Sequence, residues 1–332
     1  MNTVAPAAAE LAPNLLAYLR KELKEPTLNY AKPLTQLQGG YETYTYHFAL
    51  TGALEHLLGP LVLRLYPAFF GAQNAVWEST VQRVLAGTAY PVPQVYLTCT
   101  DLTILGGAFF IMAFLPGQPL LSAPPESVPI RLGQTHAALH GIDPGPLCEA
   151  LKHQGIAPEA YRLDRRMRQL REQSASLPWL EDVVRWLFDQ RPPEPETLAI
   201  CHGDFHPLNI LIDGDEVTAV LDWPGFLIAD PVLDVATTLL LITIPAKHAA
   251  ATLPGMEHVN WDQVGQLYLA AYQTGYPIDL THLPYYQARR AAHALLEGAR
   301  GQVVWQQPGV IGDLLELLRK ITGIQVVVPK QP

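Results

Sequence analysis

Cysteine is scarce in this sequence of 332 residues, which contains only Cys99, Cys148 and Cys201. The three are far apart in the chain, odd in number and include no CxxC pair. This pattern argues against a disulfide framework and against a thiolate zinc site. We therefore expect a reducing compartment and place the protein in the cytoplasm.

Long apolar runs and basic runs are also absent. No segment reaches about 18 uninterrupted apolar residues, and the N-terminus has no basic start followed by an apolar core, so the sequence predicts neither a membrane span nor secretion. Lys and Arg total 22 against 31 Asp and Glu, without a run of the kind that binds phosphate backbones. This balance argues against a nucleic-acid partner.

The chain is rich in apolar residues, at 49%, which indicates a folded protein with a sizeable core. Its negative charge is uneven. Residues 1–116 hold 6 Lys/Arg and 7 Asp/Glu, which leaves 16 and 24 for the remainder. A solvated surface accounts for most of this charge, and a share of it could line a pocket for a cationic ligand or hold a divalent metal.

The order of patterns along the chain predicts two lobes of different composition. Residues 7 to 25 have the spacing of an amphipathic helix, and the short runs "TYTYHFALTG", "LVLRLYP" and "FFIMAFLPG" are typical of strands, with one helical segment between the last two. After Gly117 helical patterns dominate. We predict an N-terminal β-rich lobe over residues 1–116 and a larger, mainly helical lobe over residues 117–332.

One hairpin interrupts the helical part. "NILID" and "VTAVLD" are strand-like runs around a turn, and a loop over residues 213–218 would set Asn209 opposite Asp222. Directly opposed residues lie roughly 4.5–5.5 Å apart. An amide oxygen beside a carboxylate is suited to a hard cation such as Mg²⁺, and Asp204 lies on the loop leading to the same end.

Phosphoryl transfer uses such a set. It needs one Asp to orient and deprotonate an attacking hydroxyl, and an Asn and a second Asp to hold Mg²⁺ on the phosphates. It also needs a cation from the β-rich lobe and an acidic residue that fixes this cation. Arg64 and Glu78, on a predicted strand and the helix after it, can supply both.

These motifs resemble one known family. "HGDFHPLN", the Asp-Trp pair at 222–223, "LVLRLYP", Glu78 and "FLPGQPL" are similar to the aminoglycoside phosphotransferase family, small-molecule relatives of protein kinases that include choline kinases. The resemblance implies an α+β, protein kinase-like bilobal fold. It also implies transfer of the γ-phosphoryl of ATP or GTP, with Mg²⁺, to a hydroxyl of a small molecule, foremost an aminoglycoside or macrolide antibiotic.

The resemblance also implies a role for each matching residue: Asp204 as the catalytic base, Asn209 and Asp222 as metal ligands, Arg64 as the phosphate-binding cation, Glu78 as its ion-pair partner, Gly39 and Gly40 as part of the nucleotide loop, and His202 as support for the catalytic loop. The chain departs from the family at Arg64, where Lys is usual, and Arg keeps the charge while adding a bidentate fork. Pro224 follows the Asp-Trp pair, where the family often has an acidic residue.

Several alternatives stay open. The acceptor can be choline, another amino alcohol or a sugar, and the chain can be a nucleotide-binding pseudokinase scaffold without turnover. His202, Asp204 and His206 also suit a metal-dependent hydrolase.

His136 and His140 share one helix face as a possible metal pair, although a packed helix face is the more common arrangement. The tyrosines spaced by four residues at 268, 272 and 276 favour a core stripe over a substrate cage.

Overall fold

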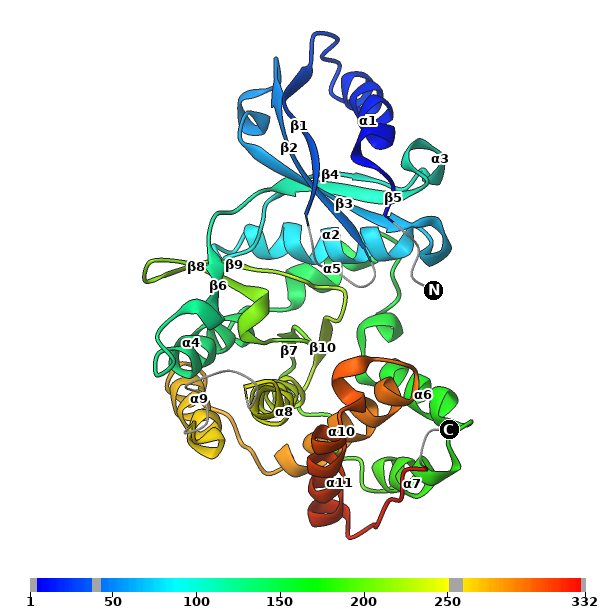
Figure 1. Ribbon diagram of the computed structural model, residues 1–332, viewed down its shortest axis with the longest axis vertical. Helices are drawn as coiled ribbons and strands as arrows, with labels where there is room; N and C mark the ends of the chain where they lie inside the picture. The colour runs from blue at the N-terminus through cyan, green and yellow to red at the C-terminus, as the bar shows by residue number, and fades with distance from the viewer. Residues whose placement is uncertain (1–4, 38–42, 251–258, 330–332) are drawn as a thin grey trace. The chain divides into compact units, whose positions relative to one another are not determined.

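The protein is described by a computed structural model over residues 5–37, 43–250 and 259–329. The chain divides into two compact units (Figure 1). Unit 1 comprises Met1–Gln118, Glu149–Gly155 and Leu211–Pro224, and unit 2 comprises Pro119–Cys148, Ile156–Ile210 and Gly225–Pro332. Residues 211–224, which the sequence analysis assigned to the C-terminal lobe, therefore group with the β-rich part of the chain.

Unit 1 is built on an antiparallel sheet of order β1-β2-β3-β5-β4. Its strands and helices are β1 (Asn29–Leu37), β2 (Tyr44–Thr51), β3 (Pro60–Pro67), β4 (Val95–Cys99), β5 (Gly107–Ala113), α1 (Ala8–Glu22), α2 (Gln73–Ala86) and α3 (Leu102–Leu105). Short 3₁₀ turns η1 (Glu55–Leu57) and η2 (Ala68–Phe70) flank β3. Strands β2, β3 and β5 and helix α2 contain the runs that the sequence predicted, whereas β1 and β4 were not foreseen.

Strand β3 shows how the sheet separates two packing surfaces. Leu61, Leu63 and Leu65 are buried in one cluster with Leu15 and other residues of α1. Val62 and Tyr66 belong to a second cluster that includes Ala75 of α2. Because side chains alternate across a strand, Arg64 points to the same face as Val62 and Tyr66, the face covered by α2.

The predicted hairpin is present, but its turn is tighter than expected. Strand β8 (Ile210–Asp213) and strand β9 (Glu216–Val220) are joined by Gly214 and Asp215 alone, with φ +57° at Gly214, so the loop expected over residues 213–218 is wrong. A two-residue hairpin turn favours positive φ, which Gly adopts without a steric cost. Because the turn is shorter, the predicted register, which set Asn209 directly opposite Asp222, is also wrong. Asn209 ends a 3₁₀ turn before β8, and Asp222 follows the end of β9.

Unit 2 is mainly helical. Its helices are α4 (Val128–His140), α6 (Leu163–Ser174), α7 (Glu181–Asp189), α8 (Pro231–Ala250), α9 (Trp261–Gly275), α10 (Leu283–Ala299) and α11 (Pro308–Thr322). Its other elements are strands β7 (Ala199–Cys201) and β10 (Leu227–Ala229), which pair antiparallel, and the 3₁₀ turns η3 (Leu120–Ser122), η4 (Pro158–Tyr161), η5 (Pro178–Leu180), η6 (Pro207–Asn209) and η7 (Val303–Gln306). Helix α5 (Gly145–His153) and strands β6 (Gln118–Pro119) and β8 contain residues of both units.

Helix α8 is unusually apolar. Its segment Pro231–Ala249 is long and apolar enough to span a membrane by length and composition, and 56% of it is buried inside the protein. Residues such as Leu233, Ala236 and Leu240 belong to one core cluster with α10 and α11. A core helix satisfies the same length and composition test, so this feature is weak evidence for a span.

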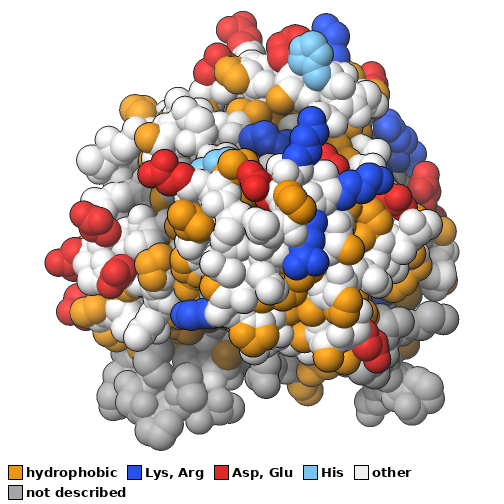
Figure 2. Space-filling model, turned by 90° about the horizontal axis from the view of Figure 1, so that it is seen from above, with side chains coloured by type: hydrophobic (Ala, Val, Ile, Leu, Met, Phe, Trp, Pro, Cys, Tyr) orange, Lys and Arg blue, Asp and Glu red, His pale blue; other side chains and the backbone are white. Residues whose placement is uncertain are grey.

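On the face shown in Figure 2, charged side chains of both signs lie scattered among hydrophobic ones.

Candidate active site

In unit 1, Arg64 lies between two carboxylates. Its Nε is 2.9 Å from Glu78 Oε2, and its Nη2 donates to Asp222 Oδ1 at 2.6 Å. The exposed fraction of the side chain is 14% for Arg64, 0% for Glu78 and 42% for Asp222. Burial lowers the pKa of Arg64, but the charges of Glu78 and Asp222 outweigh it and leave that pKa above its usual value. Arg64 is therefore a fixed cation.

Glu78 is held from several sides. Its Oε2 accepts the hydroxyl of Tyr66, and its Oε1 accepts Gln82 Nε2 at 3.2 Å and the Trp223 backbone N–H at 3.3 Å. Burial raises the pKa of Glu78 against the effect of Arg64. A fully buried carboxylate with this many donors is strongly positioned, which in turn positions Arg64.

Asp222 differs from Glu78 in both exposure and backbone. Its φ is +70°, in the left-handed region that few non-glycine residues adopt, although Asp tolerates it better than most. Such backbone strain is common at functional sites. Asp222 is thus a half-exposed carboxylate held in a strained conformation and paired with one arm of Arg64.

In unit 2, Asp204 lies in the loop after β7 and contacts Asn209, the last residue of η6. The Asn209 amide nitrogen donates to the Asp204 carbonyl oxygen at 3.0 Å and lies 3.4 Å from Asp204 Oδ2. His206 Nε2 lies 3.4 Å from the same carboxylate oxygen. With its amide nitrogen directed at Asp204, Asn209 has its amide oxygen as the atom suited to a cation.

Asp204 is ionised at neutral pH. Burial raises the pKa of its carboxyl, but the neighbouring His206, His202 and Arg290 outweigh that effect and lower it. An ionised carboxylate is the form that accepts a hydrogen bond from an attacking hydroxyl. Asp204 keeps this form throughout the physiological range.

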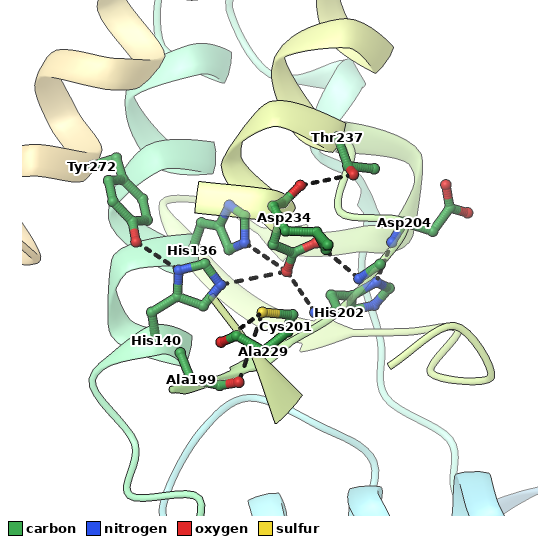
Figure 3. Close-up of polar contacts among 12 residues, drawn as sticks. His136, His140, Ala199, Cys201, His202, Asp204, Ala229, Asp234, Thr237 and Tyr272 are labelled. Carbon is green, nitrogen blue, oxygen red and sulfur yellow. Dashed lines mark hydrogen bonds and ion pairs between the residues drawn. The ribbon is translucent and has the colours of Figure 1, made fainter. Parts of the chain in front are cut away.

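The loop is anchored by Asp234 of α8, a residue with no exposed side-chain surface (Figure 3). Its Oδ2 accepts the His202 backbone N–H at 2.5 Å, and its Oδ1 accepts the Gly203 backbone N–H at 2.9 Å. The same Oδ2 lies 3.0 Å from His136 Nε2 and 3.4 Å from His140 Nε2. Although burial opposes it, these partners hold the pKa of Asp234 well below its usual value.

His136 and His140 form the outer layer of this anchor. Tyr268 and Tyr272 place their hydroxyls 2.8 Å from His136 Nδ1 and 2.6 Å from His140 Nδ1. Burial first, and His140 second, lower the pKa of His136 to about 4, so that ring is neutral at pH 7. His136 also stacks on Phe205, with ring centroids 4.1 Å apart.

The histidine pair and Asp234 also have the spacing of a metal site, since their ligand atoms lie within 4.8 Å of one another. Each Nδ1 has a tyrosine hydroxyl as its partner and each Nε2 faces Asp234 Oδ2, which is consistent with an N–H donor at Nε2. The cluster is thus hydrogen-bonded without a cation. Tyr268 and Tyr272 are buried, which is the core stripe that the sequence favoured.

Gly203 is required at its position in the loop. Its φ is +83°, and a Cβ there would lie 2.3 Å from the carbonyl oxygen of Gly225. Only glycine allows this close approach of two backbones. The turn lets the backbone N–H groups of residues 202 and 203 reach Asp234 together.

The remaining predicted residues are placed as follows. His202 is buried, and its Nδ1 accepts the Asp204 backbone N–H at 3.2 Å. His206 Nδ1 accepts the Leu208 backbone N–H, so both imidazoles of the hydrolase alternative have partners within the loop. Gly39 and Gly40 lie outside the described residues.

Asp234, which anchors the loop, was not among the residues predicted for the site. Asp230, by contrast, caps α8, since its Oδ1 accepts the Val232 backbone N–H at 2.9 Å. For Asp234 a signal existed: it is the only charged residue in the run from Pro231 to Pro245. A lone charge in a buried helix needs partners.

Residues 33–278, more than half of the chain, match the model of the family described as "Phosphotransferase enzyme family". The chain belongs to this phosphotransferase family. This membership agrees with the family resemblance that the motifs around Asp204 and Asp222 indicated.

Among solved structures, the chain is similar to a thermostable mutant of aminoglycoside phosphotransferase APH(4)-Ia in ternary complex with ADP and hygromycin B. The identity is 18% and the TM-score 0.63, covering 94% of this chain and 100% of that one. It is also similar to macrolide 2'-phosphotransferase MphH from Brachybacterium faecium, at 18% identity and TM-score 0.56, covering 96% and 99%. At this identity the likeness shows the fold, and the predicted kinase-like α+β fold is confirmed.

Among curated proteins, the chain is 27% identical to mouse (Mus musculus) acyl-CoA dehydrogenase family member 10 over 232 residues, which are 64% of this chain and 21% of that protein. It is 27% identical to human (Homo sapiens) acyl-CoA dehydrogenase family member 11 over 251 residues, which are 67% and 30%. The chain thus spans about a fifth to a third of the length of these relatives.

Proposed function

We propose that the chain transfers the γ-phosphoryl group of ATP or GTP to a hydroxyl of a small molecule. The observation that carries the proposal is the placement of Arg64, held by the fully buried Glu78 while its second arm reaches the half-exposed Asp222. A phosphate-binding cation must be fixed in position, and its second arm must be able to exchange a carboxylate for a phosphate.

The proposed reaction transfers the γ-phosphoryl group from the nucleotide to the acceptor oxygen in one step. A bond forms between the acceptor oxygen and the γ-phosphorus, and the bond from that phosphorus to the β,γ-bridging oxygen breaks, so the nucleoside diphosphate leaves with the electron pair. Asp204 orients the hydroxyl and receives its proton. Most of the catalysis then comes from positioning and from charge neutralisation.

The donor set also fits Mg²⁺. Asp222 and Asn209 would hold the ion, since carboxylate and amide oxygens are the ligands it prefers. Bound Mg²⁺ would neutralise charge on the phosphates. Gly39 and Gly40 belong, in this proposal, to the loop over the nucleotide, and His202 orders the catalytic loop through the Asp204 backbone.

The acceptor is open to several classes. The solved neighbours support an antibiotic, because their names include hygromycin B and a macrolide 2'-phosphotransferase. The curated relatives, which are named as acyl-CoA dehydrogenase family members, do not support that role. Choline, another amino alcohol or a sugar is the second candidate.

We also propose that the protein works in the cytoplasm, because Cys99, Cys148 and Cys201 are all free thiols.

A turnover screen tests the proposal. The chain is incubated with ATP or GTP, Mg²⁺ and panels of antibiotics, amino alcohols and sugars, and nucleoside diphosphate release is measured with and without acceptor. We expect release that depends on one acceptor class. Release without any acceptor favours the hydrolase, whereas nucleotide binding without release favours the scaffold.

A further inference from the structure

Unit 2 contains a group of arginines that the proposed chemistry does not use. Arg166 of α6 and Arg289 and Arg290 of α10 form this arginine cluster, on two helices that pack against each other (Figure 1). Arg289 and Arg290 are buried, with exposed fractions of 7% and 8%. Buried arginines are rare unless they are paired.

Among the described residues of this cluster, Arg289 lacks a negative partner for its side chain. Arg290 pairs with Glu297 at 3.0 Å, and its guanidinium lies over the ring of Trp305 at 4.7 Å. Arg166 Nη2 reaches the carbonyl oxygen of Gly225 at 3.4 Å. The Arg289 side chain makes no hydrogen bond and no ion pair within residues 5–37, 43–250 and 259–329, and its Nε is buried without an acceptor. A buried donor without an acceptor is costly, and a buried charge more so.

The electrostatics of the neighbouring groups agree with this shortage. Burial, then the charges of Arg166 and Arg290, lower the pKa of Arg289 to about 10. Burial and the same arginines hold the pKa of His293 well below its usual value. Arg290 thus has the carboxylate of Glu297 as its ion-pair partner, whereas the buried Nε of Arg289 has no acceptor among the described residues.

The cluster borders solvent at Arg166 and lies within electrostatic range of the predicted base. The His293 side chain, one turn from Arg289 on α10, is 36% exposed, and Arg166 is half-buried. The charge of Arg290 also contributes to the lowered pKa of Asp204, so the two groups lie within electrostatic range inside unit 2. An anion bound at Arg290 would therefore lie within electrostatic range of Asp204, the predicted base.

We propose that the arginine cluster of Arg166, Arg289 and Arg290 binds an anionic group, a carboxylate or a phosphate, on the acceptor whose hydroxyl is phosphorylated. This inference rests on the proposed function and narrows its acceptor. Guanidinium groups bind both anions through paired N–H donors, which Arg289 offers without a partner of its own. The same charges disfavour choline and polycationic aminoglycosides.

Matched acceptors test the anion requirement. One pair is 3-hydroxybutyrate and its primary amide, and the other is glucose 6-phosphate and glucose, so the two arms separate a carboxylate from a phosphate. We expect kcat/KM to be on the order of 10- to 100-fold higher for the anionic member of at least one pair, the usual effect of a charge-assisted contact. Equal values in both pairs, or preferred use of choline or hygromycin B, would overturn the proposal.

Arg289→Met tests the site without turnover. Thermal unfolding is followed with inorganic phosphate and, separately, with acetate. We expect at least one anion to raise the melting temperature of the wild type and of Arg185→Gln, an exposed arginine on α7. The rise should vanish in Arg289→Met and shrink in the half-buried Arg166→Gln. It should persist in Arg64→Ala, which excludes binding at the predicted nucleotide phosphates.

A further readout separates binding from a merely structural role. Because Arg289 is a buried charge without a partner, Arg289→Met should keep or raise the melting temperature measured without anions. An equal anion response in Arg289→Met and in the wild type would remove the site.

The two proposals fail in different ways. If no acceptor is phosphorylated but phosphate still protects the wild type and not Arg289→Met, the anion site stands and the phosphotransferase proposal falls. If a neutral acceptor is phosphorylated in a reaction that needs Asp204, the phosphotransferase stands and the anion requirement falls.

Discussion

The two units hold their central carboxylates and cations in opposite ways. In unit 1 a cation is central: Arg64 lies between Glu78, which is fully buried, and Asp222, whose side chain is 42% exposed. In unit 2 a carboxylate is central: Asp234 has four donors, all from buried or half-buried groups. The first arrangement has one partner that solvent or a ligand can reach, and the second has none.

This difference indicates a division of tasks. In the proposed function, a ligand phosphate would replace Asp222 at Arg64 without disturbing Glu78, because each carboxylate contacts a different guanidinium nitrogen. By contrast, no partner of Asp234 can leave without exposing a buried polar group, which costs about 1–3 kcal/mol each. We therefore interpret the Arg64 network as exchangeable and the Asp234 network as a fixed support for the loop of Asp204.

The largest effect on activity is expected at the supported loop itself. Asp204→Ala should lower kcat by on the order of 10²–10⁴, the usual range for a positioned general base. Nucleotide affinity should change little, because the lost contact is made mainly in the transition state. Steady-state phosphorylation and nucleotide titration measure the two quantities, and an unchanged kcat in a folded variant would remove Asp204 from catalysis.

The fixed support is tested by Asp234→Asn. The variant places an amide donor where the carboxylate accepts four hydrogen bonds, so we expect the free energy of unfolding to fall by about 3 kcal/mol or more. Chemical denaturation measures this change. Asp279→Asn is the matched control, since its exposed carboxylate accepts the Thr281 backbone N–H. Similar losses in both variants would show that Asp234 is no special anchor.

The pH dependence of stability sharpens the same point. Because burial lowers the pKa of His136 to about 4, the unfolded chain binds a proton between pH 6.5 and 4 that the folded chain does not. The free energy of unfolding should therefore fall as the pH is lowered from 6.5 to 4, and His136 should account for about 3 kcal/mol of this fall. His136→Gln should flatten the slope, and His153→Gln, at an exposed position, should not. An identical slope in both variants would contradict the buried, neutral His136.

The smallest effect is expected from a change of cation in the exchangeable network. Arg64→Lys keeps the charge but cannot span Glu78 and Asp222 with two nitrogens, so we expect roughly a tenfold loss of turnover, against roughly a hundredfold for Arg64→Ala. Arg83, whose guanidinium donates to the Thr98 hydroxyl, provides the control, and Arg83→Lys should retain wild-type turnover. Equal losses in Arg64→Lys and Arg64→Ala would separate Arg64 from the nucleotide.

The sequence predicted the family, the kinase-like fold and the elements that hold most of the expected residues. The alternation in "LVLRLYP" and the helical period around Glu78 were enough to bring Arg64 and Glu78 to one face of the sheet. The hairpin register failed because "DGDEVT" offers several turn positions, and the positive φ at Gly214 selects the shortest one.

The partners of Asp234 could not be predicted for a related reason. Its partners come from residues 136, 140, 202 and 203, and local patterns do not encode contacts over such separations. The unpartnered state of Arg289 is likewise a property of packing. The sequence of α10, the helix that contains Arg289, has an ordinary amphipathic pattern and does not indicate this state.

The central claim is that this chain moves a phosphoryl group to a small organic hydroxyl, and isotope transfer tests it most directly. The chain is incubated with γ-³²P-labelled ATP or GTP, Mg²⁺ and a mixed acceptor pool, and the labelled products are separated. We predict label in an organic phosphate ester, lost in Asp204→Ala. Label found only in inorganic phosphate, or nucleotide that stays intact under every condition, would contradict the account.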